Sequence, residues 1–329
     1  MKTSVSQQSQ KPARPGGGSA ALKPLRLLKR YCLITSAIAL ALGATLIGCG
    51  GGGKQPIHRS NAISVFVSGQ DVYVAGRSYD PSQDKQVATV WKNGAPQYLA
   101  TQHGTSIATS VFVSGEDVHV VGNQEDEFYY SCPAYWKNGI LQQLPDGTGY
   151  SGASSVFVSG EDVYIAGRFK GNAILLKNGV QQPMDFSDSE SSGMSVYVAN
   201  GDVYVAGNRL EQGRSIATLW KNGAAQNLNE NFATVIRNSF AASVSVSGED
   251  VYVAGYVGAG TDTGCYPVLW INGTPRYLQL QASVFYRPAS SVFVSGGDVY
   301  VTGFEGGQTL EDPMNVARLW KNGVAQELK

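Results

Sequence analysis

A single unit of 40 to 48 residues recurs six times after residue 60, and this repeat constrains the fold more than any other feature of the chain. The first copy reads "SVFVSGQDVYVAG" (residues 64–76) and then "ATVWKNGAPQYL" (residues 88–99). One aspartate per copy marks the period: Asp71, Asp117, Asp162, Asp202, Asp250 and Asp298. Successive aspartates are 46, 45, 40, 48 and 48 residues apart.

Each unit contains four short runs rich in Val, Tyr, Phe and Leu, which are too short and too β-branched for helices. The first two runs meet at a Ser-Gly-Glu-Asp type turn, and the last two meet across Asn-Gly, the strongest short hairpin signal. Such a four-stranded meander, repeated around an axis, is typical of a β-propeller. The sequence therefore predicts an all-β fold, a six-bladed β-propeller with four-stranded antiparallel blades. A β-helix would have a shorter period, and a helical solenoid would need helices.

The predicted repeats span residues 61–106, 107–151, 152–191, 192–239, 240–287 and 288–329. If blade and repeat share one phase, every blade comes from consecutive strands, and ring closure depends on packing between the first and last blades. The other phase would make one blade from strands of both termini. The sequence leaves both phases open.

All five tryptophans open the tetrapeptide "WKNG" or its variant "WING", and Leu176 opens "LKNG" in the third unit. The repetition predicts a structural role, so we expect the tryptophans to pack between blades. They are Trp91, Trp136, Trp220, Trp270 and Trp320. We expect the repeated aspartates to accept hydrogen bonds from nearby main-chain amides, and the lysines of "KNG" to be solvated.

The first fifty residues have the order of a secretory signal: a basic stretch "KPLRLLKR", an apolar run and then small residues. The run ends in "LIGC", which resembles the lipobox of bacterial lipoproteins. That resemblance implies a signal peptide over residues 1–48, lipidation of Cys49 and a Gly-rich tether over residues 49–60. With Gly50 after the cysteine, it also implies the outer membrane. The alternative is an uncleaved membrane anchor, because residues 31–48 approach the length of a span.

Charge argues against broad nucleic-acid binding. Residues 1–48 hold seven of the 25 basic residues and none of the 25 acidic ones, which leaves 18 basic against 25 acidic residues and a charge of about −7. Nucleic-acid binding depends on basic stripes that displace counterions from phosphate.

The "SVFV…DVYVAG" half of the unit resembles NHL and related bacterial β-propeller repeats. The full unit with "WKNG" resembles uncharacterised repeat-containing bacterial lipoproteins. These resemblances imply the fold and carry no activity.

The two turn motifs share one end of each blade and are nearly uniform, whereas the loops at the other end vary in length and composition. Because loops on a rigid scaffold carry function, we expect a binding site at the variable end. The candidate residues are Tyr79, Tyr129, Tyr130, Arg237, Tyr286 and Arg287. The expected role is a membrane-anchored, monomeric scaffold that binds a protein or a glycan.

The alternative is a propeller enzyme, a hydrolase or lyase acting on envelope or extracellular polymers. The sequence shows no motif for nucleophilic, zinc-dependent or phosphate-binding chemistry, and we expect no cofactor. Several loop carboxylates leave a calcium site open. Cys132 and Cys265 lie in units two and five, which a six-bladed ring places opposite each other, so we expect no disulfide between them.

Overall fold

The computed structural model of the chain describes residues 60–145, 151–185, 190–232, 236, 238–258, 265–280, 288–306, 316–326 and 328. The predicted signal segment, Cys49, Arg237, Tyr286 and Arg287 lie outside these residues. In the part of the chain described, no helix is long and apolar enough to cross a membrane.

The described residues form six four-stranded antiparallel sheets. The first sheet contains β1 (Asn61–Ser68), β2 (Asp71–Asp80), β3 (Lys85–Lys92) and β4 (Ala95–Tyr98). The second contains β5 (Ser106–Ser114), β6 (Asp117–Glu125), β7 (Ser131–Lys137) and β8 (Ile140–Gln142). The third contains β9 (Gly152–Ser159), β10 (Asp162–Phe169), β11 (Asn172–Lys177) and β12 (Val180–Gln181).

The fourth sheet contains β13 (Ser191–Ala199), β14 (Asp202–Glu211), β15 (Arg214–Lys221) and β16 (Ala224–Asn227). The fifth contains β17 (Asn238–Ser247), β18 (Asp250–Gly258), β19 (Cys265–Ile271) and β20 (Thr274–Tyr277). The sixth contains β21 (Ala289–Ser295), β22 (Asp298–Glu305), β23 (Val316–Lys321) and β24 (Val324–Gln326).

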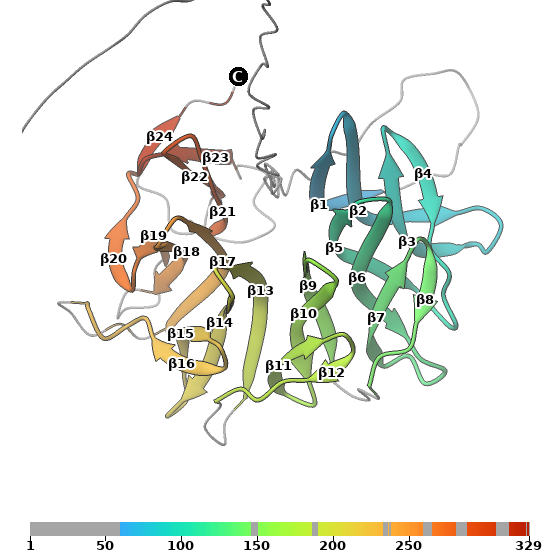
Figure 1. The fold of residues 1–329 in the computed structure, drawn as a ribbon, viewed down its shortest axis with the longest axis horizontal. Coiled ribbons are helices and arrows are strands. Elements are labelled where there is room, and N and C mark those ends of the chain that lie inside the picture. The colour runs from blue at the N-terminus through green and yellow to red at the C-terminus, as the bar shows by residue number, and fades with distance from the viewer. Residues whose placement is uncertain are drawn as a thin grey trace, which may run out of the picture. The chain divides into compact units, whose positions relative to one another are not determined.

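Each sheet is one blade of a β-propeller, which confirms the predicted fold class. The first strand of every blade lines a common central pocket, and the fourth strand lies on the outside (Figure 1). All four strands of each blade are consecutive in the chain. Of the two phases that the sequence leaves open, the structure therefore has the one in which blade and repeat coincide. None of the six described blades contains strands from both termini.

The hairpins form where the sequence places Asn-Gly. Asn93 and Gly94 join β3 to β4 with φ of 51° and 84°. Positive φ at both positions is the type I′ turn that suits twisted antiparallel strands. The glycine of "VYVAG" has a different role: a Cβ on Gly76 would collide with the main-chain oxygen of Asn61, where the pairing of β1 with β2 shifts register.

Serine side chains of the first strands join consecutive blades. The main-chain amide of Val111 in blade two donates to Ser64 Oγ in blade one at 3.4 Å. Four equivalent bonds of 3.2 Å follow around the ring, to the serines Ser110, Ser155, Ser195 and Ser243. Among the described residues, the sixth such bond, between Ser291 and the amide of Val65, is absent.

The tryptophans show the same asymmetry. Trp136, Trp220, Trp270 and Trp320 are all 0% exposed. Each indole Nε1 donates to a main-chain oxygen in the segment after an earlier fourth strand, as Trp136 does to Ala100 at 2.6 Å. Trp91 of blade one is only half-buried. The "WKNG" tryptophan thus forms a contact between blades. In four blades this side chain is fully buried and hydrogen-bonded to the main chain.

Candidate functional site

A polar clasp holds the end of each blade where the sequence is uniform. Asn93 Nδ2 donates to Asp71 Oδ1 at 2.8 Å, while Asn93 Oδ1 accepts the amide of Val72 at 2.8 Å. Lys92 Nζ lies 2.9 Å from Asp71 Oδ2 and 5.3 Å from the centre of the Tyr73 ring. This clasp corrects one expectation, because the aspartate takes side-chain donors; the lysine remains exposed, as expected, and is ion-paired as well.

The asparagine–aspartate bond recurs in all six blades, and the lysine–aspartate pair in five. In blade five Ile271 stands at the lysine position, where it pairs with Tyr252. Hydrogen bonds from the lysine and then the asparagine hold the pKa of the five paired aspartates below its usual range. Because the same bonds recur from blade to blade, the clasp has a structural role.

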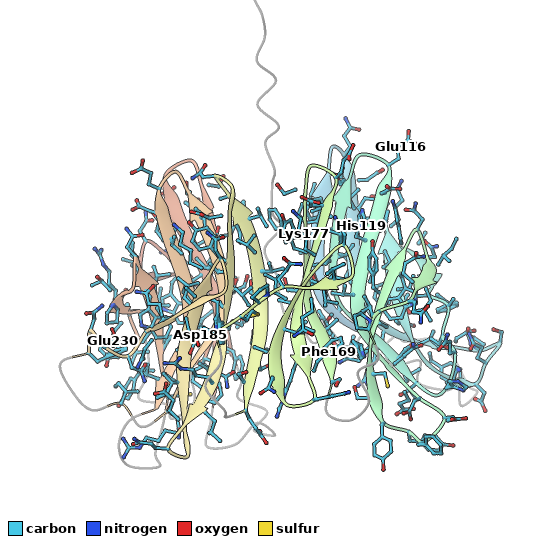
Figure 2. The ribbon with its side chains drawn as sticks, turned by 60° about the horizontal axis from the view of Figure 1, so that its bottom comes forward. Glu116, His119, Phe169, Lys177, Asp185 and Glu230 are labelled. Carbon is cyan, nitrogen blue, oxygen red and sulfur yellow. The ribbon has the colours of Figure 1, made fainter. Side chains whose placement is uncertain are left out.

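In Figure 2, Glu116 marks the end of blade two at which the clasp lies, and Phe169 marks the opposite end of blade three.

The central pocket is small and carries little chemistry. It has a volume of about 140 Å³ and is lined by Ser, Val and aromatic residues of the six first strands. Phe66, Phe112, Phe157 and Tyr197 pack in sequence, with ring centres 4.6, 4.9 and 4.8 Å apart. Ser245 occupies the equivalent position in blade five. The residues that line this pocket include no His, Asp, Glu, Lys or Arg.

Three of the candidate binding residues lie in the described part of the chain. Tyr79, in β2, is half-buried; its hydroxyl donates to Asp84, and its main-chain oxygen accepts the hydroxyl of Tyr98 at 3.3 Å. Tyr79 is therefore held within its own blade. Tyr129 and Tyr130 lie between β6 and β7 of blade two, and the structure does not bring them together with Tyr79 in one described contact.

The β6–β7 hairpin ends in three consecutive exposed aromatic residues. Phe128 is 68% exposed, Tyr129 79% and Tyr130 60%. Asp126 fixes the turn, since its Oδ1 accepts the amides of Phe128 and Tyr130 at 2.8 and 2.9 Å. Tyr129 has a φ of 64°, a left-handed conformation that is rare for a bulky residue. Sparsely populated backbone conformations of this kind concentrate at functional sites.

A groove of about 710 Å³ lies on blade two beside this hairpin. Its lining comes from three segments: the link at residues 100–102, the paired ends of β6 and β7, and β8 with the residues that follow it. The polar lining side chains are mostly amides: Gln102, Gln124, Gln142 and Gln143. The apolar ones include Ile140, which is 66% exposed. Among the lining residues that the structure describes, none is charged.

Strand register connects the groove to the aromatic hairpin. Gln124 pairs with Cys132, and two residues further along the hairpin Asp126 bonds to the main chain of Tyr130. Side chains two apart on a strand share a face, and so do directly paired ones. The 3.9 Å approach of Cys132 Sγ to Asp126 Oδ2 places Asp126 on the face of Cys132, and the bond of the Asp126 amide to the Tyr130 carbonyl continues the pairing to Tyr130. We call the aromatic tip (Phe128, Tyr129 and Tyr130) and this groove the blade-two site.

The six units show which groove residues belong to the repeat and which occur in blade two alone. Gln142 stands at a repeat position, and its amide bonds to the main chain of Ile140 just as Gln182 bonds to Val180 and Gln326 to Val324. Gln124 and Gln143 have no glutamine counterpart in the other units. The sequence prediction missed Phe128, Gln102, Gln124 and Gln143. The signal available for them was that they depart from the repeat.

The described residues hold no group of three or more His, Cys, Asp or Glu placed to bind a metal ion. His119 replaces the repeated tyrosine in blade two and is 3% exposed, with Nδ1 2.8 Å from the hydroxyl of Tyr135. Burial raises the pKa of Tyr135 to about 12 and lowers the pKa of His119. This pair belongs to the interior of the blade and faces neither the groove nor the central pocket.

No known protein family matches the chain, and no curated protein matches it. Several solved structures are similar. The computationally designed Ika8 protein aligns over 83% of this chain and 74% of its own, with 15% identity and a TM-score of 0.44. An exo-1,5-α-L-arabinanase from a bovine ruminal metagenomic library aligns over 82% and 98%, with 9% identity and a TM-score of 0.43. The β-propeller domain of the trilobed protease from Pyrococcus furiosus, described as having an open velcro topology, aligns over 82% and 95%, with 9% identity and a TM-score of 0.40. At such identities these likenesses concern the fold alone.

Proposed function

We propose that this protein is a binding protein of the bacterial cell envelope that holds its ligand at the blade-two site. The observation that carries the proposal is the run of three exposed aromatic residues on an ordered hairpin, directly beside an uncharged groove. Exposed aromatic side chains combine a large contact area with few rotatable bonds, which makes them the usual anchors of interfaces.

The hairpin is prepared for binding before a ligand arrives. Asp126 accepts two main-chain amides of the tip and so limits the conformations of Phe128 and Tyr130. Less conformational entropy is then lost when a ligand binds. A groove of this volume falls within the range of ligand sites, about 300 to 1,000 Å³.

The composition of the site favours binding over catalysis. Acid–base or nucleophilic catalysis needs titratable groups within hydrogen-bond reach of each other. The groove offers amides and the single thiol of Cys132, and the central pocket offers serines, valines and aromatic rings.

A capture experiment tests the role of the hairpin. Purified full-length protein is immobilised and incubated with solubilised envelope from the producing bacterium, and bound protein and sugar are both quantified. The comparison is with Phe128→Ala/Tyr129→Ala/Tyr130→Ala. The matched control is Tyr277→Ala, another exposed aromatic, 56% exposed on β20 of blade five. We expect the triple variant to lose its captured material and the control to retain it. Equal recovery by all three proteins contradicts the proposal.

The proposal includes attachment to the membrane through a lipid on Cys49, with an outer-membrane location. Its support is the order of basic stretch, apolar run and "LIGC" in the sequence. Acyl chains contribute about 0.8 kcal/mol per buried methylene, so several chains give stable anchoring. Labelling cells with a palmitate analogue tests it: wild type should be labelled and Cys49→Ala unlabelled. Label retained in Cys49→Ala excludes this anchor.

A further inference from the structure

We infer that the ligand of the blade-two site is an uncharged glycan chain. This inference rests on the proposed function and specifies its ligand class. It draws on the polar groups of the groove, the aromatic rings at its end and the charges around both.

Several side-chain amides of the groove have no hydrogen-bond partner among the described residues. The side chains of Gln102 and Gln143 are exposed and form no hydrogen bond with the described residues. Gln124 Oε1 accepts the amide of Gln102 at 3.3 Å, which leaves its NH₂ group available. A glutamine side chain offers both donors and acceptors. Sugar hydroxyls also donate and accept, so amides match them without any charge.

The aromatic tip supplies the apolar half of sugar recognition. One face of a pyranose ring carries mainly C–H groups, which pack on the negative face of an aromatic ring. Tyr130 stands two residues before Cys132 of the groove lining, and Phe128 and Tyr129 are the exposed aromatic residues next to it at the tip. Apolar stacking surfaces at one end and amides along the floor together suit a chain of several sugar units.

The charges near the site select against ionic ligands. None of the described residues that line the groove is charged, so a cationic or anionic group bound beside them would lose hydration without a partner there. The hairpin next to the tip carries Glu125, Asp126 and Glu127. These carboxylates repel uronates and phosphates, which leaves neutral sugars as the favoured class.

The thiol of Cys132 gives a direct readout of occupancy, because Cys132 is half-buried in the groove lining. Full-length protein is alkylated with iodoacetamide, and modification of Cys132 and Cys265 is followed by peptide mass spectrometry. Cys265, buried at the start of β19 in blade five, is the internal control. The probes are neutral oligosaccharides of β-1,4-glucan, α-1,4-glucan and β-1,4-xylan, an oligogalacturonate and an uncharged Gly/Ser/Thr peptide.

We expect at least one neutral oligosaccharide to slow alkylation of Cys132 about tenfold at ten times its Kd, and to leave Cys265 unchanged. The oligogalacturonate and the peptide should have no effect. Protection by the peptide or by the oligogalacturonate alone overturns the inference, and so does a lack of protection by every neutral sugar.

Two variants separate the site from the fold. Tyr130→Ala and Gln143→Ala should each weaken the affinity for the protecting sugar, Tyr130→Ala by about tenfold. Asn227→Ala, at the same repeat position as Gln143 but in blade four, should leave it unchanged. If the hairpin variants abolish capture from envelope extract while no neutral sugar binds, the glycan inference fails and the proposed function stands.

Discussion

The indole Nε1 of Trp320 donates a 2.7 Å hydrogen bond to the main-chain oxygen of Gln279, which lies after the last strand of the preceding blade. The bond joins blade six to blade five, and the indole is 0% exposed. The same relationship links Trp270 to Leu228 at 2.9 Å. Trp91 stands at the same repeat position but is half-buried.

We expect Trp320→Phe to lower the free energy of unfolding by about 2 to 3 kcal/mol, because the change shrinks a fully buried side chain and removes the donor to the Gln279 carbonyl. Trp91→Phe should cost less than half as much. Denaturant unfolding of both variants checks this. Equal losses would show that Trp91 is as completely packed as the other four tryptophans.

Acid should weaken the clasp at the uniform end of the blades. The pKa of Asp162 is lowered first by Lys177 and then by Asn178, so its carboxylate stabilises the fold above the unfolded pKa of about 4. That contribution is lost as the pH falls through the folded pKa. Asp162→Asn should therefore lower the unfolding midpoint at pH 7 and change it little at pH 2. An undiminished difference at pH 2 contradicts the assignment.

Blade five offers the reverse experiment. Ile271→Lys would place an ammonium beside Asp250 and Tyr252, as in the other blades. We expect a small rise in the unfolding midpoint at pH 7, since exposed ion pairs contribute little. The rise should disappear in 1 M salt, where the Debye length is about 3 Å. A gain that persists at high salt would point to packing instead of charge.

His119 should make blade two sensitive to mild acid. Burial, and then the charge of Lys137, lowers its folded pKa below the unfolded value of about 6.5. The contribution of the neutral His119 to the free energy of unfolding is thus fully present above pH 6.5. It is lost as the pH falls from 6.5 through the folded pKa. His119→Tyr combined with Tyr135→Leu restores the repeat sequence and should remove the fall between pH 7.5 and 5.5. Thermal unfolding at the two pH values checks this, and an unchanged fall excludes His119 as its source.

Cys132 and Cys265 lie in β7 of blade two and β19 of blade five. We expect both thiols to react with iodoacetamide in the unreduced, denatured monomer. A peptide pair linked through these two cysteines would contradict the ring order of the blades, because a disulfide needs Cα atoms about 4.4 to 6.8 Å apart.

The fold was predictable because each local signal recurs six times and all the copies agree. Asn93 and Gly94 predict the turn that they form. The six repeated aspartates, one in each unit, predict the number of blades. The clasp was less accessible, because the partner of Asp71 is 21 residues away at Lys92 and only strand pairing brings them together.

The candidate site was predictable only in part, for a similar reason. Tyr129 and Tyr130 stand out as aromatic residues in a variable loop. The groove forms where the link at Gln102, which bonds to Gln124, and Gln143 beyond β8 line the same space. These residues are distant in the sequence, so no local pattern predicts that they lie together. The useful signal was the departure of single positions from a repeat whose other positions agree.

The most direct test of the central claim is site-specific photo-crosslinking in living cells. A benzophenone amino acid replaces Tyr129 at the hairpin tip or, as the matched control, Val180 on the outer strand of blade three, which is 64% exposed. Benzophenone inserts into C–H bonds and so captures proteins and glycans alike. We expect a discrete higher-mass adduct from position 129 and none from position 180. Absence of an adduct at 129, or the same adducts from both positions, would contradict a binding site on this hairpin.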